Sequence, residues 1–537
     1  MPIICPISRQ ESLVQIRRAV LALISAAMLL PWLNPVAPGP SPTVIPWLAS
    51  LLVTAALLLL FSLMALLSGL PFSSKSGSEQ TFRSCIQTVA GAWVIAGVAS
   101  CIIGLSQYFG VADHFAPWFS SAKIGEAFAN LRQRNQFASL TNIALATLIW
   151  LSTRIAFWPR MDDRQPALLI ISGLLATGNA ASASRTGLLQ IVLLCLLCWV
   201  WGLWRQRAVL HVLLTAVSAY ALATLALPWL SGFDLSLHGM AARLLAGDEA
   251  CASRITLWSN VLHLIALKPW LGWGWGELDY AHYITLYDGT RFCEILDNAH
   301  NLPLQLAVEL GVPVALLVCG GFLWWALRQR PWRETDPTRQ LAWSVLAIIL
   351  LHSMLEYPLW YGPFQIAFGL CIGMLWRTGK TTLGGAVVPK IVLNTRLPLV
   401  LPSFSAIILI ACVVYAAWDY LRISQIYLAP EQRDAAYRDD TLAKIQGSRL
   451  FSDQVRFAQL LLTPLTLDNA QWTFNTATAM LHYSPEPRVI EKVIESAVML
   501  GRHGEALEHL ARYQAAFPAD HALWAQKNAE SLSRSEL

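Results

Sequence analysis

Charged residues are scarce in this chain. Only 13% of its 537 residues are Asp, Glu, Lys or Arg, whereas about 25% of the residues of a soluble globular protein are charged. Apolar residues make up 55%, and the mean hydropathy is +0.49. This deficit of charge argues against a soluble protein, and the long apolar runs predict a polytopic membrane protein instead.

Several functional motifs are also missing. The sequence has no soluble basic patch interleaved with aromatic residues, so it gives no sign of nucleic-acid binding. Cys195 and Cys198 have C-x-x-C spacing, but they lie in the apolar run "IVLLCLLCWV", which indicates helix packing rather than a redox or zinc site. The first apolar run is followed by many others, which argues against a cleaved signal peptide.

The apolar runs predict the architecture. We expect an all-α polytopic membrane protein with about 11 transmembrane helices, because each run approaches the roughly 20 residues that cross a bilayer. The predicted spans are roughly 13–33, 45–70, 85–108, 133–152, 166–181, 187–204, 208–230, 302–327, 340–357, 362–376 and 397–418.

Basic residues predict the orientation. They collect in alternate loops: Arg17, Arg18, Lys75, Arg83, Arg154, Arg160, Arg164, Arg205, Arg207, Arg328, Arg330, Arg333, Arg339, Arg377, Lys380, Lys390 and Arg396. The opposite loops 34–44 and 358–361 carry none, and 109–131 carries only Lys123. The positive-inside rule therefore predicts a cytoplasmic N-terminus and a C-terminal domain on the opposite side of the membrane. Because the chain is bacterial in character, we expect that side to be the periplasm and the membrane to be the inner membrane.

This topology predicts four parts. They are an N-terminal transmembrane bundle (1–230), a large helical periplasmic loop (231–301), a C-terminal transmembrane bundle (302–418) and a periplasmic helical domain (419–537). The loop contains Cys251 and Cys293. Because the periplasm is oxidising, these residues either form a disulfide or remain free and pack against the membrane. The stretch from Gly501 to Asn528 predicts a tetratricopeptide-like unit, which either binds a protein or only caps the membrane domain.

A histidine precedes an apolar helix at the predicted outer face, in "DNAHNLPLQLAVELG". Pro303 fits only a first helical turn, so the helix begins near Asn301, which can cap it. The positive end of this helix disfavours an imidazolium, so His300 tends to stay neutral and able to accept a proton. One polar stripe follows at four-residue spacing: Asn301, Gln305 and Glu309. Spacing alone favours a structural and a catalytic His300 equally.

Arginines form the other candidate sites. In "NLRQRNQFA", Arg132 and Arg134 either extend to the membrane surface or bind a ligand. Arg185 in "SASRTG" and Arg254 in "SRITLW" are isolated outer arginines, and an arginine fork binds phosphate bidentately. They predict a pyrophosphate site, with ordinary surface charge as the alternative. The outer loops contain no DxD, no HxxxH and no acidic pair at ligand spacing, so we expect no metal.

The order of these motifs resembles the O-antigen ligase superfamily, and within it the pilin-type protein O-oligosaccharyltransferases (PglL/PilO-like). The matching stretches lie along roughly 120–370: "QRN", "SRTG", "RITLW", "GWGW", "HNLPLQLAVELG" and "HSMLEYPLWY". The "EYPLWY" stretch and the tetratricopeptide-like domain favour the protein-glycosylating branch. The family often reads "HSHN" where this chain has "NAHN", so Asn298 replaces the first histidine.

The resemblance implies a reaction in which a glycan is transferred en bloc from undecaprenyl pyrophosphate to Ser or Thr of a periplasmic protein such as a pilin. It implies that His300 is catalytic. It also implies a set of residues that bind substrate or pyrophosphate: Gln133, Arg134, Asn135, Arg185, Arg254, Tyr357 and Tyr361. The supporting residues would be Asn301, Gln305, Glu309 and Glu356.

This chemistry suits the residues. A hydroxyl is a poor nucleophile, so a neutral His300 would act as general base, and arginines would stabilise the leaving pyrophosphate without a metal or other cofactor. The expected partners are the lipid-linked oligosaccharide, the acceptor protein and membrane lipids. The alternatives are an O-antigen ligase that uses lipid A–core as acceptor, an O-antigen polymerase, a scaffold that uses only the repeat domain, and a membrane transporter. A transporter would show internal repeats and polar residues near the midplane.

Overall fold

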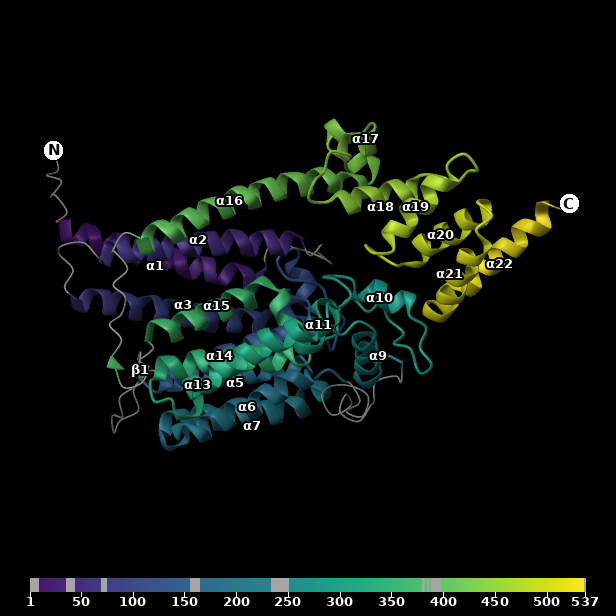
Figure 1. Ribbon diagram of the computed structural model, residues 1–537. Helices are drawn as coiled ribbons and strands as arrows, with labels where there is room; N and C mark the ends of the chain where they lie inside the picture. The colour runs from purple at the N-terminus through teal and green to yellow at the C-terminus, as the bar shows by residue number, and fades with distance from the viewer. Residues whose placement is uncertain are drawn as a thin grey trace. The chain divides into compact units, whose positions relative to one another are not determined.

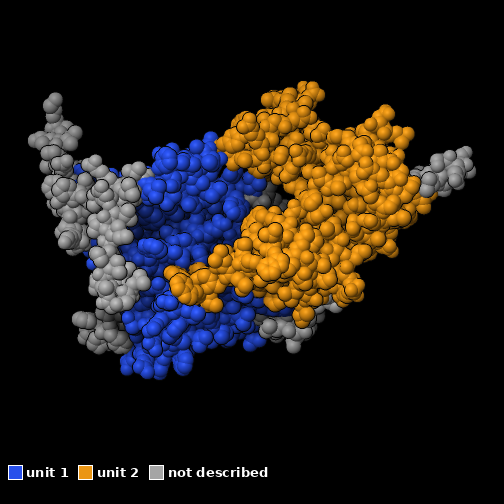
Figure 2. Space-filling view, viewed as in Figure 1, with its two compact units in different colours: residues 1–247, 326–414 blue, residues 248–325, 415–537 orange. Residues whose placement is uncertain are grey.

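The computed structural model describes residues 9–34, 44–68, 75–154, 165–232, 251–378, 382–383, 386–387 and 397–535. The chain divides into two compact units (Figure 2). Unit 1 comprises residues 1–247 and 326–414, and unit 2 comprises residues 248–325 and 415–537. Each unit therefore combines segments that lie far apart in the sequence.

Unit 1 is a bundle of long apolar helices (Figure 1). Its principal helices are α1 (Arg9–Leu33), α2 (Val44–Ser68), α3 (Lys75–Tyr108), α4 (Arg134–Ser152), α5 (Gln165–Ala181), α6 (Arg185–Val200), α7 (Arg207–Leu230), α14 (Pro337–Ser353) and α15 (Gly362–Thr378). Short 3-10 turns connect them: η1 (Ala112–Phe115), η2 (Ala129–Leu131), η3 (Leu203–Arg205), η5 (Pro331–Arg333) and η6 (Pro358–Trp360). Two-residue strands, β1 (Thr382–Leu383) and β2 (Ala386–Val387), pair antiparallel.

The helix α4 lies at the centre of unit 1. It packs against α3, α5, α6, α7 and α14, and nearly all of its residues from Gln136 onward are buried. Small residues allow the close approach of these helices. A Cβ atom at Gly187 would lie 2.5 Å from Asn179 Oδ1 and 2.7 Å from Ala138 Cβ. Such small-residue interfaces are typical of membrane helices, where packing rather than hydrophobic burial drives association.

Unit 2 contains the part of the loop near His300 and the C-terminal helices. The loop segment forms α9 (Arg254–Leu267), α10 (Leu278–Ile284), α11 (Leu302–Leu310) and α12 (Val312–Ala315), and continues through a π-helical turn η4 (Leu316–Gly320) into α13 (Gly321–Gln329). The C-terminal part follows α16 (Leu397–Ser424). It comprises η7 (Gln425–Tyr427), η8 (Pro430–Gln432), η9 (Ala435–Tyr437), α17 (Thr441–Ile445), α18 (Ser452–Leu462), α19 (Ala470–Met480), α20 (Pro487–Met499), α21 (His503–Ala516) and α22 (Pro518–Ser535).

The C-terminal helices share one core with the loop. Consecutive helices from α18 to α22 pack against their neighbours. Their core contains Phe474, Ile490 and Tyr513, and it also includes Tyr283 from α10. The expected helical character of this region is therefore present, while its assignment as a tetratricopeptide-like unit stays a prediction.

Six described helices are long and apolar enough to cross a membrane: Ser12–Leu33, Val44–Leu67, Glu79–Tyr108, Arg207–Leu230, Val312–Arg333 and Leu401–Tyr427. Every predicted span corresponds to a helical segment, but the count of about eleven crossings stays a prediction. The segment expected over 302–327 is divided, because α11 ends at Leu310 and Gly311 has φ +89°. The apolar span begins after this break, at Val312.

Candidate functional site

His300 is held in an unusual backbone conformation before α11. Its φ is +48°, a left-handed value that costs a residue other than glycine about 1–3 kcal/mol. Two side chains hold this segment. The His300 amide donates to Asn298 Oδ1 at 2.8 Å, and the Ala299 amide donates to Gln305 Oε1 at 2.6 Å. Asn301 caps the helix by accepting from the Leu304 amide at 3.2 Å. The backbone at His300 is therefore fixed by its neighbours.

The polar stripe of α11 connects His300 to the "GWGWG" turn. Glu309 accepts a hydrogen bond from the Gly276 amide at 2.9 Å and another from the Gln305 side chain. Burial raises the pKa of the Glu309 carboxyl to about 7, although these hydrogen bonds oppose the shift. Glu309 therefore positions Gln305, and Gln305 positions the segment that carries His300.

The "GWGWG" turn docks backbone to backbone on the end of α11. The Trp273 amide donates to Val308 O at 2.9 Å, and the Gly274 amide donates to Glu309 O at 2.9 Å. A Cβ atom at Gly272 would clash with the Glu309 carbonyl, so this close approach requires glycine. These contacts hold the turn of residues 272–276 against the C-terminal end of α11.

Arg254 begins the helix that lies beside this segment. Ser253 caps α9 by accepting from the Thr256 amide at 3.2 Å. One turn further on, Trp258 Nε1 donates to the Ala299 carbonyl at 3.1 Å, directly before His300. Unit 2 therefore brings the first turns of Arg254's helix against the segment of His300.

A disulfide ties the same two segments together. Cys251 precedes α9, Cys293 precedes His300, and the two residues are bonded with their Cα atoms 5.3 Å apart. Asn260 of α9 adds two hydrogen bonds. It accepts from the Phe292 amide at 2.8 Å and donates to Thr290 O at 3.1 Å. The segment that leads to His300 is therefore joined to α9 by hydrogen bonds from the Asn260 side chain, and to the residue preceding α9 by the disulfide.

Unit 1 assembles the other predicted residues around Asn135. Ser184 Oγ, directly before Arg185, donates to Asn135 Oδ1 at 2.6 Å. Asn135 Nδ2 donates to Glu356 Oε1 at 3.3 Å. The "QRN", "SRTG" and "EYPLWY" stretches therefore meet in one unit. Asn135 uses both ends of its amide to connect them, so its geometry is that of a positioning residue.

The remaining predicted side chains of unit 1 also have partners within the protein. Gln133 caps α4 by accepting from the Gln136 amide at 2.9 Å. Arg134 forms an ion pair with Glu126 at 2.6 Å, with both side chains about one-third exposed. Tyr357 and Tyr361 stack with ring centroids 5.9 Å apart. The predicted residues thus fall into two groups, one in each unit.

Sequence reasoning missed a buried polar network at the centre of unit 1. His352 Nδ1 lies 2.9 Å from Ser139 Oγ, which also accepts from Gln190 Nε2 at 2.7 Å. Asn142 Nδ2 then donates to Gln190 Oε1 at 2.9 Å. Buried polar groups need such partners. The available signal was the polar spacing within α4, where Ser139 and Asn142 interrupt an apolar run.

Sequence reasoning also missed the roles of Asn298 and Trp258. Asn298 stands where the resembled family often has histidine, and only the structure shows that its side chain binds the His300 amide. Trp258 gave no signal, because its partner is the carbonyl of a residue 41 positions away.

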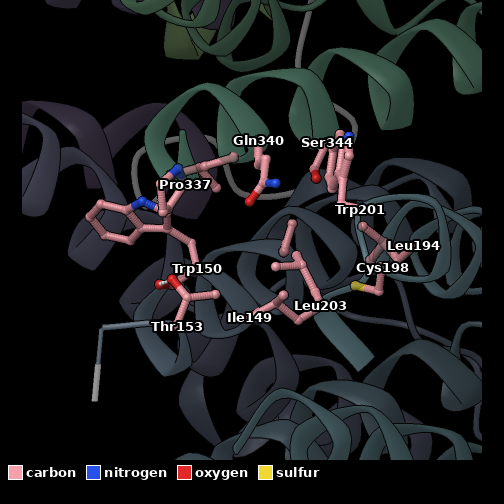
Figure 3. Close-up of a pocket in the computed structure, with 12 residues that line it drawn as sticks. Ile149, Trp150, Thr153, Leu194, Cys198, Trp201, Leu203, Pro337, Gln340 and Ser344 are labelled. Atoms are coloured by element: carbon pink, nitrogen blue, oxygen red, sulfur yellow. Dashed lines mark hydrogen bonds between the residues drawn. The ribbon is translucent and has the colours of Figure 1, made fainter. Parts of the chain in front are cut away.

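A pocket in unit 1 lies at the opposite end of α4 from Asn135 (Figure 3). It is lined by residues at the ends of α4, α6 and α14, including Trp150, Cys198 and Gln340. Trp150 is fifteen residues beyond Asn135 on α4, which corresponds to roughly 22 Å along the helix. The lining of this pocket contains none of the predicted site residues. Among the described residues, no group of three or more His, Cys, Asp or Glu side chains is arranged to hold a metal ion.

Comparisons with protein families connect both groups to known motifs. The O-antigen ligase model matches residues 170–319, which include Arg185, Arg254 and His300. The resemblance to the O-antigen ligase superfamily is confirmed. The model of a protein glycosylation ligase matches residues 127–151, the segment of "QRN". The C-terminal model of a virulence factor membrane-bound polymerase matches residues 340–531.

Individual proteins to which the chain is similar include two from Acinetobacter baylyi. A ComP-specific O-oligosaccharyltransferase is 25% identical over 293 residues, covering 54% of this chain and 51% of the relative. A general O-oligosaccharyltransferase is 24% identical over 338 residues, covering 61% of this chain and 56% of the relative. The matched region thus spans about half the length of these relatives. No solved structure matches the chain.

Proposed function

We propose that this protein is a membrane O-oligosaccharyltransferase. It transfers a glycan en bloc from undecaprenyl pyrophosphate to a Ser or Thr hydroxyl of a periplasmic protein such as a pilin. The observation that carries this proposal is the segment of His300, held left-handed by Asn298 and Gln305 and fastened to the helix of Arg254. The names of the two Acinetobacter relatives support the reaction type.

The proposed reaction is a direct displacement with inversion. Neutral His300 takes the hydroxyl proton as the hydroxyl oxygen attacks the anomeric carbon, and a new glycosidic bond forms. The bond between the anomeric carbon and the pyrophosphate oxygen breaks, and the pyrophosphate leaves with the electron pair. Arg185 and Arg254 balance the charge that develops on this leaving group. His300 later releases its proton to solvent, which completes the cycle.

The other proposed contacts serve substrate binding and support. Gln133, Arg134, Asn135, Tyr357 and Tyr361 line the donor or acceptor path in this proposal. Glu356 supports Asn135, to which it is hydrogen-bonded. Asn301, Gln305 and Glu309 support the helix that follows His300. No step is assigned to a metal, so treatment with EDTA leaves the transfer rate unchanged, and strong inhibition by EDTA contradicts this mechanism.

We further propose an inner-membrane location with the C-terminal domain in the periplasm. The alternation of basic loops supports this orientation. The disulfide between Cys251 and Cys293 supports it independently, because such bonds persist in oxidising compartments.

The deciding experiment is co-expression with a lipid-linked glycan and candidate acceptor proteins, followed by mass spectrometry of the periplasmic fraction. We expect glycan on Ser or Thr of an acceptor, and its loss in His300→Ala at equal membrane abundance. His114→Ala, an exposed histidine on η1, is the matched control and retains transfer. Transfer retained in His300→Ala removes the assignment of the general base.

Two related functions are candidates because the family models favour them. The O-antigen ligase model covers Arg185, Arg254 and His300, and the polymerase model covers the C-terminal region. Glycan found only on lipid A–core would support the ligase. Glycan chains lengthened on the carrier, without any protein acceptor, would support the polymerase.

A further inference from the structure

Arg132 ends a segment that is tightly fixed in unit 1. Gln107 of α3 donates to Ser120 O at 2.7 Å and Ala129 O at 3.1 Å, and accepts from the Ala129 amide at 2.7 Å. Asn130 donates to Leu33 O and Trp118 O, each at 2.8 Å. These two buried amides fasten the segment before Arg132 to three other parts of the unit.

Arg132 is partly buried, with its two terminal nitrogens enclosed, and its guanidinium forms no ion pair with the described residues. Its Nη1 and Nη2 atoms are inaccessible and have no hydrogen-bond partner, and Nε reaches only Ser120 Oγ at 3.5 Å. Within the described ranges, no other arginine has both terminal nitrogens in this state. Burial lowers the pKa of Arg132. An arginine nevertheless remains charged, so the fold holds an uncompensated positive charge here.

Each of the three residues that follow Arg132 makes at least one polar contact within the protein. Gln133 caps α4, Arg134 pairs with Glu126, and Asn135 bridges Ser184 and Glu356. The two nearby carboxylates, Glu126 and Glu356, therefore already have partners. Arg132 is the member of this stretch whose two terminal nitrogens are both enclosed and have no hydrogen-bond partner.

The backbone at Arg132 is also unusual. Its φ is +59°, a left-handed value that an arginine adopts only when its surroundings impose it. The residue directly precedes the cap of α4, and the hydrogen bond between Asn135 and Ser184 brings the beginning of α6 beside the beginning of α4. The N-terminus of α4 adds positive potential next to Arg132.

We propose that Arg132 binds a phosphate-bearing group through its guanidinium fork. On the proposed function, this group is the pyrophosphate of the lipid-linked donor. The two terminal nitrogens match two oxygens of one phosphate, a geometry that Lys does not reproduce. Arg134, by contrast, binds Glu126, so Arg132 makes the principal phosphate contact of the "QRN" region.

The first test measures binding rather than turnover. The full chain is placed in phosphatidylcholine nanodiscs, and undecaprenyl pyrophosphate is titrated while thermal unfolding is followed by tryptophan fluorescence. We expect the wild type to be stabilised, and Arg132→Gln to bind at least tenfold more weakly. Arg132→Lys should also bind more weakly, because it keeps the charge and loses the fork. Lys123→Gln, which removes an exposed charge from the same outer segment, should bind like the wild type.

Two outcomes of this titration overturn the proposal. Equal binding by the wild type and Arg132→Gln shows that the fork does not contact the donor. A lower melting temperature of unliganded Arg132→Gln shows that the protein already compensates the guanidinium. Removal of an uncompensated charge should instead leave this temperature unchanged or raise it.

The second test separates the lipid carrier from ordinary phospholipids. The titration is repeated in nanodiscs that contain phosphatidylglycerol. Stabilisation by phosphatidylglycerol that depends on Arg132, with no response to undecaprenyl pyrophosphate, overturns the assignment to the donor. A response to the pyrophosphate in both membranes supports it.

Transfer assays distinguish this inference from the proposed function. If the wild type glycosylates no acceptor but binds the pyrophosphate through Arg132, the binding site stands and the proposed function fails. If the wild type glycosylates protein and Arg132→Gln has an unchanged KM for the donor, the function stands and the inference fails.

Discussion

Removing the disulfide between Cys251 and Cys293 should destabilise the unit that carries His300. The bond joins residues 42 positions apart. In the chain-entropy model, a closed loop of this length lowers the entropy of the unfolded chain by about 13 cal/mol/K, which corresponds to about 4 kcal/mol at 25 °C. Losing about 4 kcal/mol of stability lowers the melting temperature of a unit of about 200 residues by roughly 8–16 °C.

The assay is thermal unfolding of the purified chain in detergent, with and without reductant. The double variant Cys251→Ser with Cys293→Ser should melt at the temperature of the reduced wild type and should not respond to reductant. Cys412→Ser, a free exposed cysteine on α16, is the matched control and should behave like the wild type. A shift of the wild type by less than about 2 °C on reduction refutes the entropic reasoning. Alkylation of both residues without reductant refutes the bond itself.

Three further predictions concern the surroundings of His300 and the C-terminal helices. Asn298→Ala removes the hydrogen bond to the His300 amide, worth about 1 kcal/mol, so kcat for glycan transfer should fall roughly fivefold with KM little changed. Burial raises the pKa of Glu309 to about 7, so its contribution to stability is present below the unfolded value near pH 4.5 and is lost as pH rises through 7. The melting temperature of Glu309→Gln relative to wild type should therefore increase between pH 5 and pH 8, and a constant difference contradicts this. His482 bonds Glu277 at 2.7 Å and stacks on Tyr280, so His482→Ala should speed limited proteolysis of the C-terminal helices, while His503→Ala should not.

Local sequence rules predicted the helices well. The start of α11 follows from Asn301 as cap and Pro303 in the first turn, and both features depend only on neighbouring residues. The end of that helix was not foreseen. The predicted span over 302–327 treated Gly311 as part of an apolar run. The structure instead places the Gly311 backbone against the Trp270 carbonyl, which a Cβ atom would prevent.

The candidate residues were found by motif, but their relationships were not. The hydrogen bond from Asn135 to Glu356 joins residues 221 positions apart, and no spacing rule contains such a contact. Residue type alone does not distinguish Arg132 from Arg134, and only the family resemblance singles out Arg134. Their difference is tertiary, since Glu126 lies within reach of only one of them. Burial of a charge and the position of its partner cannot be deduced from residue type alone.

The shared core of unit 2 restricts how this protein can be recombined with its relatives. Tyr283 of the loop is buried within the C-terminal helices, and its hydroxyl lies 2.9 Å from His509 Nδ1. A chimera that exchanges only residues 415–537 therefore replaces half of an interface and leaves Tyr283 against foreign side chains. Exchange of acceptor preference between relatives should succeed only when residues 251–325 travel with the C-terminal helices. We therefore expect residues 251–325 and 415–537 to change together during evolution, because they share one core.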